Sequence, residues 1–274
     1  MGLNCNFSCG HCLNSSKPGN KNYDISQEEV LKLLADIKAN ENIRYVSFSG
    51  GEPLLYLDFI KTIISGCREL KGRDIYFSVT SNGSLIKKFS DCIRNLKINF
   101  CTLSYDASHQ KFIDIEEFRT CVLEAKEVFD QVELNVAYKN LEEISLVKDL
   151  AFTLHVKVNL NQQIASGRGA STANALVTEK SNIVCPSMER EDSLKITYLP
   201  KVGYSVCCGP ILFDGLAPRE FVATDQLSNI SNTSLYKLMN QLAKSSEDLI
   251  SDVSCNKCRT YFLKNKQQQG AQKP

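Results

Sequence analysis

Segments with the pattern of a helix alternate regularly with segments with the pattern of a strand over residues 25–160. The helix expected over 25–39 opens with a capping box, in which Ser26 stands three residues before Glu29, and its apolar residues recur on one face. Strands that alternate with helices in this way predict right-handed βαβ units and a parallel sheet or barrel. Active-site groups should then gather at the carboxyl ends of the strands.

The other expected elements follow the same rhythm. Further helices are expected near 57–70, 84–95, 115–127 and 141–152, and strands over 45–48, 74–80, 99–104, 131–137 and 155–160. Beyond them, 161–182 is rich in small and polar residues and is typical of a linker or long loop. A hairpin is expected from 194–199 and 203–207, and a helix over 234–247. We therefore place a core domain at 1–164, a linker at 165–182, a second domain at 183–262 and a disordered tail at 263–274.

Charge and hydropathy exclude several classes of function. Lys and Arg number 32 against 31 Asp and Glu, a formal charge of +1. The sequence has no basic stripe, so a nucleic-acid partner is not expected. No apolar run approaches the roughly 20 residues of a membrane-spanning helix, and a signal peptide is not evident, so we expect a cytoplasmic protein with no membrane partner. Twelve cysteines in a reducing compartment then indicate metal ligands or catalytic thiols rather than disulfides.

The first cysteine group is Cys5-x3-Cys9-x2-Cys12, which places three thiols within eight residues. Soft thiolate ligands select iron–sulfur clusters, zinc or copper(I), and three protein ligands leave one iron of a cluster open. The alternative is a structural zinc site, in which His11 would supply the fourth ligand. Adjacent side chains such as those of His11 and Cys12 seldom converge on one ion, so an iron–sulfur cluster is favoured.

A second motif, Ser49-Gly50-Gly51-Glu52-Pro53, follows the strand at 45–48. Together with the cysteine spacing it resembles the radical S-adenosylmethionine (SAM) enzyme superfamily over about residues 1–170. The resemblance implies an α/β fold, a partial (β/α)6 barrel. It also implies a [4Fe–4S] cluster on the three cysteines, with SAM chelating the open iron. Reduction of that cluster, by a flavodoxin- or ferredoxin-type protein, would yield a 5′-deoxyadenosyl radical.

The resemblance also assigns cofactor contacts to individual residues. Gly50, Gly51 and Glu52 would present backbone groups to the methionine amine, which would explain the absence of side chains there. Residues after the next two strands would contact the carboxylate or ribose, although Asn-Gly and Ser-x-Asp are also ordinary turn sequences. His11 would pack near the adenine, and so would the Gly-Arg-Gly-Ala segment that begins at Gly167. The full set is His11, Gly50, Gly51, Glu52, Pro53, Ser81, Asn82, Ser104, Asp106 and Gly167.

One departure concerns the start of the chain. Members of the superfamily carry a strand upstream of the cysteine loop, whereas only four residues precede Cys5 here. Either the start is truncated or the barrel is incomplete.

The second cysteine group lies in the last third of the chain. Cys255-x2-Cys258 is a common metal-binding pair. Cys185 and Cys208 would complete four ligands, and the pattern from Cys185 through Gly203-x4-Cys208 resembles the auxiliary-cluster extensions called SPASM and twitch domains. A small α+β domain with an auxiliary [4Fe–4S] cluster is expected, with zinc as the alternative.

Cys207 precedes Cys208 directly, and adjacent strand side chains point to opposite faces, so one of the two is spare. We expect Cys208 to bind the cluster and Cys207 to return a hydrogen atom to the substrate, as in some radical epimerases of the superfamily. A buried inert thiol is the alternative. The cysteines at 67, 92, 101 and 121 have no evident partner and are expected in the core.

Three functions remain open on these residues. The first is hydrogen-atom abstraction from a ribosomally made peptide, leading to crosslinking, epimerisation or oxidation. The second is a radical dehydrogenase, epimerase or cyclase of a small molecule such as an aminosugar or nucleotide. The third is a noncatalytic metal-binding interaction protein.

Overall fold

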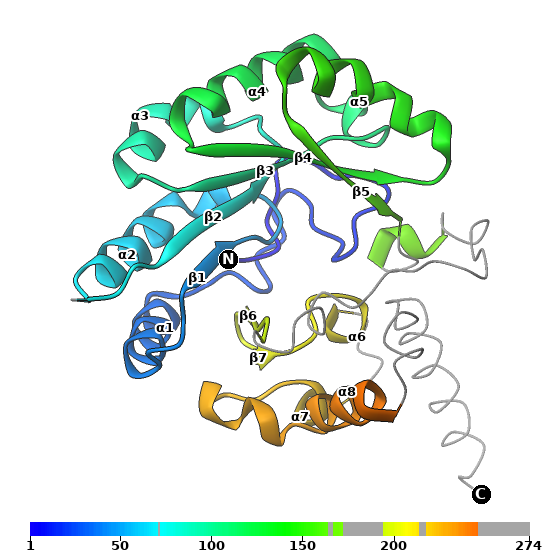
Figure 1. The fold of residues 1–274 in the computed structure, drawn as a ribbon. Coiled ribbons are helices and arrows are strands. Elements are labelled where there is room, and N and C mark those ends of the chain that lie inside the picture. The colour runs from blue at the N-terminus through cyan, green and yellow to red at the C-terminus, as the bar shows by residue number, and fades with distance from the viewer. Residues whose placement is uncertain (71, 164–166, 172–193, 214–217, 246–274) are drawn as a thin grey trace, which may run out of the picture. The chain divides into compact units, whose positions relative to one another are not determined.

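The computed structural model describes residues 1–70, 72–163, 167–171, 194–213 and 218–245 (Figure 1). The chain divides into two units, the first made of residues 1–10 and 16–163 and the second of 11–15 and 164–274. Cys5 and Cys9 therefore belong to the first unit and Cys12 to the second. Among the described residues, no helix has the length and apolar character that crossing a bilayer requires.

The first unit is a five-stranded parallel sheet whose strands follow chain order. The strands are β1 (Tyr45–Phe48), β2 (Tyr76–Ser81), β3 (Phe100–Ser104), β4 (Gln131–Tyr138) and β5 (Lys157–Gln162). The helices are α1 (Gln27–Ala39), α2 (Leu57–Arg68), α3 (Ile86–Leu96), α4 (Ile115–Val128) and α5 (Leu141–Leu154), and they lie along one face of the curved sheet (Figure 1). The alternation predicted from sequence is confirmed, and this fold matches the expected partial barrel. Two 3₁₀ turns that sequence did not predict, η1 (Pro53–Tyr56) and η2 (His109–Lys111), follow β1 and β3.

Local sequence explains these helix starts. Ser26 accepts a hydrogen bond from the N–H of Glu29, whose carboxylate accepts the N–H of Ser26, so the predicted capping box is present. Asp114 caps α4 by accepting the N–H of Glu117 at 2.8 Å. These caps satisfy N–H groups that a helix start leaves without an intrahelical partner.

The core of the first unit lies between the sheet and its helices. Leu103, Leu134 and Val136 of the central strands are fully buried. Tyr105, just after β3, stacks on Phe118 of α4 with ring centroids 4.1 Å apart and an interplanar angle of 11°. Both rings are fully buried, so α4 is fixed against the carboxyl end of β3.

The N-terminal segment lies against the turn after β1. The N–H of Gly51 donates to the carbonyl of Gly2 at 2.9 Å, and the N–H of Glu52 donates to the carbonyl of Asn4 at 3.0 Å. A Cβ at Gly51 would lie 2.2 Å from the Asn4 oxygen, so only glycine permits this approach. Residues 1–4 thus lie beside the turn that follows β1.

Glu52 joins the carboxyl ends of β1 and β2. Its side chain is fully buried and accepts the N–H of Leu54, the N–H of Asn82 and the hydroxyl of Ser81, at 3.1, 2.9 and 2.9 Å. Burial raises the pKa of Glu52 to about 7, although these hydrogen bonds oppose the shift. The carboxyl group therefore organises two strand ends and is not exposed to solvent.

The second unit contains a two-stranded antiparallel hairpin of β6 (Thr197–Leu199) and β7 (Gly203–Ser205), as predicted. Its turn holds Lys201 at a φ of +63°. The helix predicted over 234–247 is present as α8 (Ser234–Ser245). The other elements, which sequence did not predict, are η3 (Gly167–Ser171), α6 (Pro210–Phe213), α7 (Arg219–Val222) and η4 (Leu227–Asn232). The predicted tail at 263–274 and most of the predicted linker lie outside the described residues.

Removing the Phe118 ring should destabilise the first unit strongly. Phe118→Ala leaves a cavity beneath Tyr105, and we expect a loss of about 3–5 kcal/mol in the free energy of unfolding. Leu123→Ala on the same helix, where the side chain is 48% exposed, should change it by less than about 0.5 kcal/mol. Denaturant titration followed by circular dichroism measures both, and equal losses would contradict this view of the core.

The buried Glu52 carboxyl should make stability depend on pH. Its pKa is about 7 when folded against an ordinary value of 4.5, so the unfolded state loses this proton first and wild type loses stability as pH rises through that window. We expect the free energy of unfolding of wild type, minus that of Glu52→Gln, to fall by roughly 3 kcal/mol between pH 4.5 and 7 and then to level off. Glu127→Gln, an exposed change on α4, should show no such fall. A flat difference for Glu52→Gln would refute the assignment.

Candidate functional site

Cys5 sits where the N-terminal loop meets the end of β2. Its sulfur is buried and accepts the N–H of Phe7 at 3.4 Å, and the side-chain amide of Asn82 lies 3.9 Å away. The N–H of Cys5 donates to the carbonyl of Lys17 at 3.3 Å, which closes the loop behind it. The Phe7 and Asn82 N–H groups both face the sulfur, which in its thiolate form would be a metal ligand.

Asn82 holds the cysteine loop to the sheet. Its amide donates to the side-chain oxygen of Asn6 at 2.9 Å, and its own oxygen accepts the hydroxyl of Ser84 at 2.6 Å. Its backbone N–H is bound by Glu52. Ser81, Asn82 and Glu52, three of the residues singled out from sequence, are thus brought together in one buried network.

Cys9 is buried beside His109, a residue that sequence reasoning did not select. His109 Nδ1 lies 3.1 Å from Asp106 Oδ1, an ion-pair contact whose angle falls short of an ideal hydrogen bond. Burial alone would lower the pKa of His109, but its interactions with Asp106 and Cys9 raise it to about 10. The signal in the sequence was the spacing Asp106-x2-His109, which a turn closed by the N–H of His109 on the carbonyl of Asp106, at 2.9 Å, brings together just before η2.

Cys12 is described within the second unit. Its sulfur lies 3.0 Å from the side-chain oxygen of Asn14, and its carbonyl accepts the N–H of Arg168 at 3.1 Å. Gly167 has a φ of +55°, and a Cβ there would lie 2.3 Å from the Leu13 carbonyl oxygen. The predicted Gly167 segment therefore packs directly on the backbone of the third cysteine.

The other residues predicted to contact the cofactor lie in the turn after β1, at the end of β3 and in the second unit. Gly50 has a φ of +150° and packs against Gly2 in the turn after β1. Pro53 is buried at the first position of η1, where its missing N–H costs no helical hydrogen bond. Ser104 ends β3 half-buried, and His11 is half-buried in the second unit.

Of the second cysteine group, the structure describes Cys207 and Cys208. Cys207 is half-buried, its sulfur accepts the N–H of Gly209 at 3.4 Å, and its N–H donates to the Ser205 hydroxyl at 3.0 Å. Cys208 is exposed. Cys185, Cys255 and Cys258 lie outside the described residues, so the auxiliary cluster stays a prediction.

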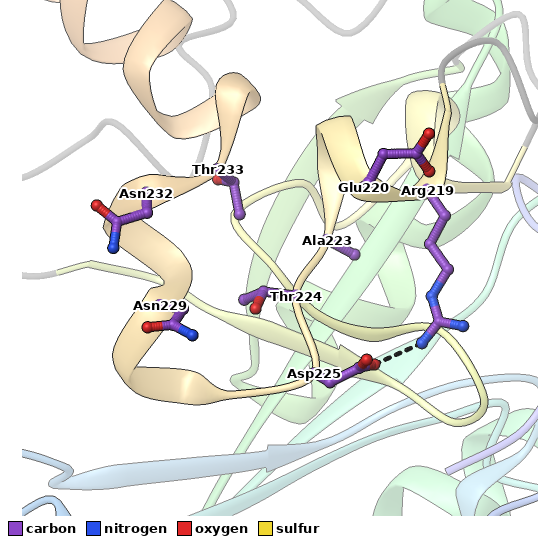
Figure 2. Close-up of a pocket in the computed structure, with 8 residues that line it drawn as sticks. All are labelled: Arg219, Glu220, Ala223, Thr224, Asp225, Asn229, Asn232 and Thr233. Atoms are coloured by element: carbon purple, nitrogen blue, oxygen red, sulfur yellow. Dashed lines mark hydrogen bonds and ion pairs between the residues drawn. The ribbon is translucent and has the colours of Figure 1, made fainter.

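The second unit also has a polar pocket of about 600 Å³ over α7 and η4 (Figure 2). Arg219 points across it to Asp225 at 2.6 Å and also donates to the carbonyl of Val202 at 2.7 Å. Asn229 donates to Gln226 at 3.2 Å. None of the site residues predicted from sequence lines this pocket.

The residues present suit an iron–sulfur cluster. Buried thiols at Cys5 and Cys9 offer soft ligands, and N–H groups face the Cys5 sulfur, as outer-shell donors do around metal-bound thiolates. The Gly51 turn, which admits no Cβ, keeps backbone groups next to this loop. The chemistry such a site supports is binding and reduction of an iron–sulfur cluster.

The chain is similar to known proteins of two kinds. The chain is 25% identical over 224 residues to the putative peptide biosynthesis protein YydG of Bacillus subtilis, covering 77% of this chain and 68% of that protein. It is 30% identical over 162 residues to a probable GTP 3′,8-cyclase of Saccharolobus islandicus, covering 56% of this chain and 51% of that protein. The chain thus spans about half the length of the cyclase.

Solved structures share the fold. anSMEcpe with bound AdoMet and the Kp18Cys peptide gives a TM-score of 0.50 at 19% identity, covering 60% of this chain and 49% of that one. BtrN in complex with AdoMet and 2-DOIA gives 0.50 at 16% identity, covering 93% and 91%. Residues 1–135 match the family model described as the Radical SAM superfamily, whose members are enzymes that use a [4Fe–4S] cluster and SAM. Through residues 1–135, the chain belongs to the Radical SAM superfamily.

Proposed function

We propose that this chain binds a [4Fe–4S] cluster through Cys5, Cys9 and Cys12 and abstracts a hydrogen atom from a ribosomally made peptide. These three cysteines would hold the cluster, which when reduced and with SAM bound would supply the electron for release of a 5′-deoxyadenosyl radical. The observation that carries the proposal is the backbone pairing of the glycine turn with the cysteine loop, at Gly51 with Gly2 and Glu52 with Asn4. It keeps the turn that we assign to the methionine amine beside the loop that carries the buried Cys5.

The residues of the chain divide the work of binding. The N–H groups of Gly51 and Glu52 already donate to the cysteine loop, so the turn's carbonyls are the groups we assign to the positive methionine amine. Ser104 and Asp106 are assigned to the carboxylate or ribose, and His11 and Gly167 to the adenine. The Glu52 carboxylate, buried under three donors, holds the turn and does not contact the cofactor.

A peptide is the substrate class we favour. The similarity to a peptide biosynthesis protein covers 77% of this chain, more than the 56% matched in the GTP cyclase. A small-molecule radical cyclase or dehydrogenase is the second candidate, supported by the higher 30% identity to that cyclase. A small precursor peptide encoded beside the gene would favour the first, and sugar or nucleotide biosynthesis genes would favour the second.

The C-terminal region completes the proposal. We assign Cys185, Cys208, Cys255 and Cys258 to an auxiliary cluster of twitch type, and Cys207 to hydrogen-atom return. A flavodoxin- or ferredoxin-type protein would deliver the electron. The reduced thiols that both sites need fit the cytoplasm.

The cluster assignment is tested by anaerobic reconstitution. Wild type should bind iron and sulfide and, with dithionite and SAM, release 5′-deoxyadenosine. The triple variant Cys5→Ala/Cys9→Ala/Cys12→Ala should lose this product to background because no ligand remains for the open-iron cluster. Cys92→Ala on α3, away from both groups, should behave as wild type. Zinc without product in wild type would leave a noncatalytic binding protein.

Gly51→Ala should weaken the binding of the cluster, because it disrupts the pairing of the turn with the cysteine loop. Its Cβ would lie 2.2 Å from the Asn4 oxygen and 3.0 Å from the Cys5 Cβ, so the loop must move. We expect iron loss to a chelator to become roughly tenfold faster, the size of an outer-shell effect. Gly10→Ala, whose Cβ meets no described atom within 4 Å, is the control in the same loop. Equal rates in the two variants would argue against the pairing.

A further inference from the structure

We propose that the side chains of Asn135, Asn161 and Gln163 bind a backbone amide of the peptide substrate. Asn135 and Asn161 lie in the carboxyl-terminal halves of β4 and β5, and Gln163 directly follows β5 in the first unit. The inference rests on the proposed function, because it takes a peptide as the substrate. It adds residues that distinguish a peptide from a small molecule, which the cysteine and glycine motifs do not identify.

The three side chains lie on the face of the sheet opposite the helices. Asn135 stands between Leu134 and Val136, whose fully buried side chains pack toward the helices, so its own side chain points the other way. The side-chain amide of Asn161 donates to the Asn135 side-chain oxygen, which places Asn161 on that same face. Gln163 comes two residues later, and its N–H extends the backbone ladder to β4 at 3.0 Å, so it shares the face of Asn161.

Gln163 carries a buried oxygen that lacks a donor. Its side chain is 8% exposed, and its amide N–H donates to the carbonyl of Ala137 at 3.3 Å. With the nitrogen directed at Ala137, the acceptor left over is Oε1, which has no hydrogen-bond partner among the described residues. A buried acceptor without a donor costs stability, and each such group in a folded protein calls for a partner. An N–H of the substrate is the donor that this oxygen lacks.

The two asparagines supply the rest of the match. Because the Asn161 amide nitrogen donates to the Asn135 oxygen, Asn135 keeps its own side-chain N–H groups for a ligand, and Asn161 keeps its oxygen. Together with the Gln163 oxygen, they present a neutral donor beside neutral acceptors. A peptide group likewise carries one N–H donor and one carbonyl acceptor.

Charge on the two strands also favours a neutral ligand. Within β4 and β5 the sequence has one basic residue, Lys157, whose Nζ lies 3.8 Å from Glu133 Oε2. The phosphates of a nucleotide are commonly bound by Arg, by Lys or by a helix N-terminus. The row of amides offers none of these, so it suits a peptide group better than a nucleoside triphosphate.

The row adjoins residues that we assign to the cofactor. Asn135 is paired with Ser104 in the register of β3 and β4, and its carbonyl accepts the N–H of Tyr105 at 3.1 Å. Ser104 is one of the two residues assigned above to the carboxylate or ribose of SAM. A peptide held along the row therefore has a residue beside the cofactor, as hydrogen-atom abstraction requires.

Binding of a blocked peptide to the full chain tests the row. The probe is N-acetyltriglycine N-methylamide, which presents backbone amides without side chains, and nuclear magnetic resonance titration measures its affinity. Gln163→Met keeps the side-chain length and removes the oxygen, whereas Asn135→Asp keeps the bond from Asn161 and removes the N–H groups. Each should weaken binding roughly tenfold, the size of a lost hydrogen bond. Gln131→Met, the same change at an exposed site where β4 begins, should bind as wild type.

Ester analogues of the probe give a second arm that leaves the protein unaltered. Each analogue replaces one amide by an ester and so lacks a single N–H. One of them should bind wild type roughly tenfold more weakly than the amide, and Gln163→Met should not distinguish the two. If Gln163→Met does not fold, the ester series with wild type decides alone.

Three results overturn the inference: no binding of the probe to wild type, equal affinity for the amide and every ester, or tighter binding of GTP than of the probe. The proposed function fails separately, if reconstituted wild type releases no 5′-deoxyadenosine.

Discussion

The site depends on the close approach of two backbone segments, the cysteine loop and the turn after β1. Two hydrogen bonds, from Gly51 to Gly2 and from Glu52 to Asn4, set their register. The approach is possible only because Gly51 has no side chain. Once this pairing is made, Cys5 lies at the carboxyl edge of the sheet, where the end of β2 can add its own contacts through Asn82.

Two buried acidic groups then hold the loops that surround this edge. Glu52 binds donors from η1 and from the end of β2, and Asp106 binds donors from the loop after β3. Burial of carboxyl groups is costly unless hydrogen bonds or opposite charge compensate it. The raised pKa of Glu52 shows that its compensation is incomplete, whereas Asp106 has His109 as a partner. Burial of the Glu52 carboxyl group therefore costs stability, while its hydrogen bonds fix the ends of β1 and β2.

The sequence predicted the helices and strands of the first unit better than the contacts between them. Hydrophobic periodicity and the capping box at Ser26 located the helices and strands because these are local properties. The reason for the glycines was only partly foreseen. They were assigned to the methionine amine, an assignment that stays a prediction, whereas the structure shows that Gly51 has to admit the backbone of Asn4. Such a contact joins residues 47 positions apart, so no local pattern could reveal it.

The same limit explains Glu52 and His109. Glu52 was expected to contribute backbone groups, yet its side chain accepts hydrogen bonds from Ser81 and Asn82, at the end of the next strand. His109 was overlooked because its partner Cys9 is a hundred positions away. Only its link to Asp106 was visible, as a three-residue spacing that is also common in ordinary turns.

The groups described at the carboxyl edge also explain why relatives with different substrates share this fold. In the proposed function, these backbone carbonyls and cysteine sulfurs would serve a cofactor whose chemistry is the same whichever molecule is modified. This set of groups therefore carries no preference between a peptide and a nucleotide, and similarity to both a peptide biosynthesis protein and a GTP cyclase is expected. Substrate choice must arise outside this shared set of residues.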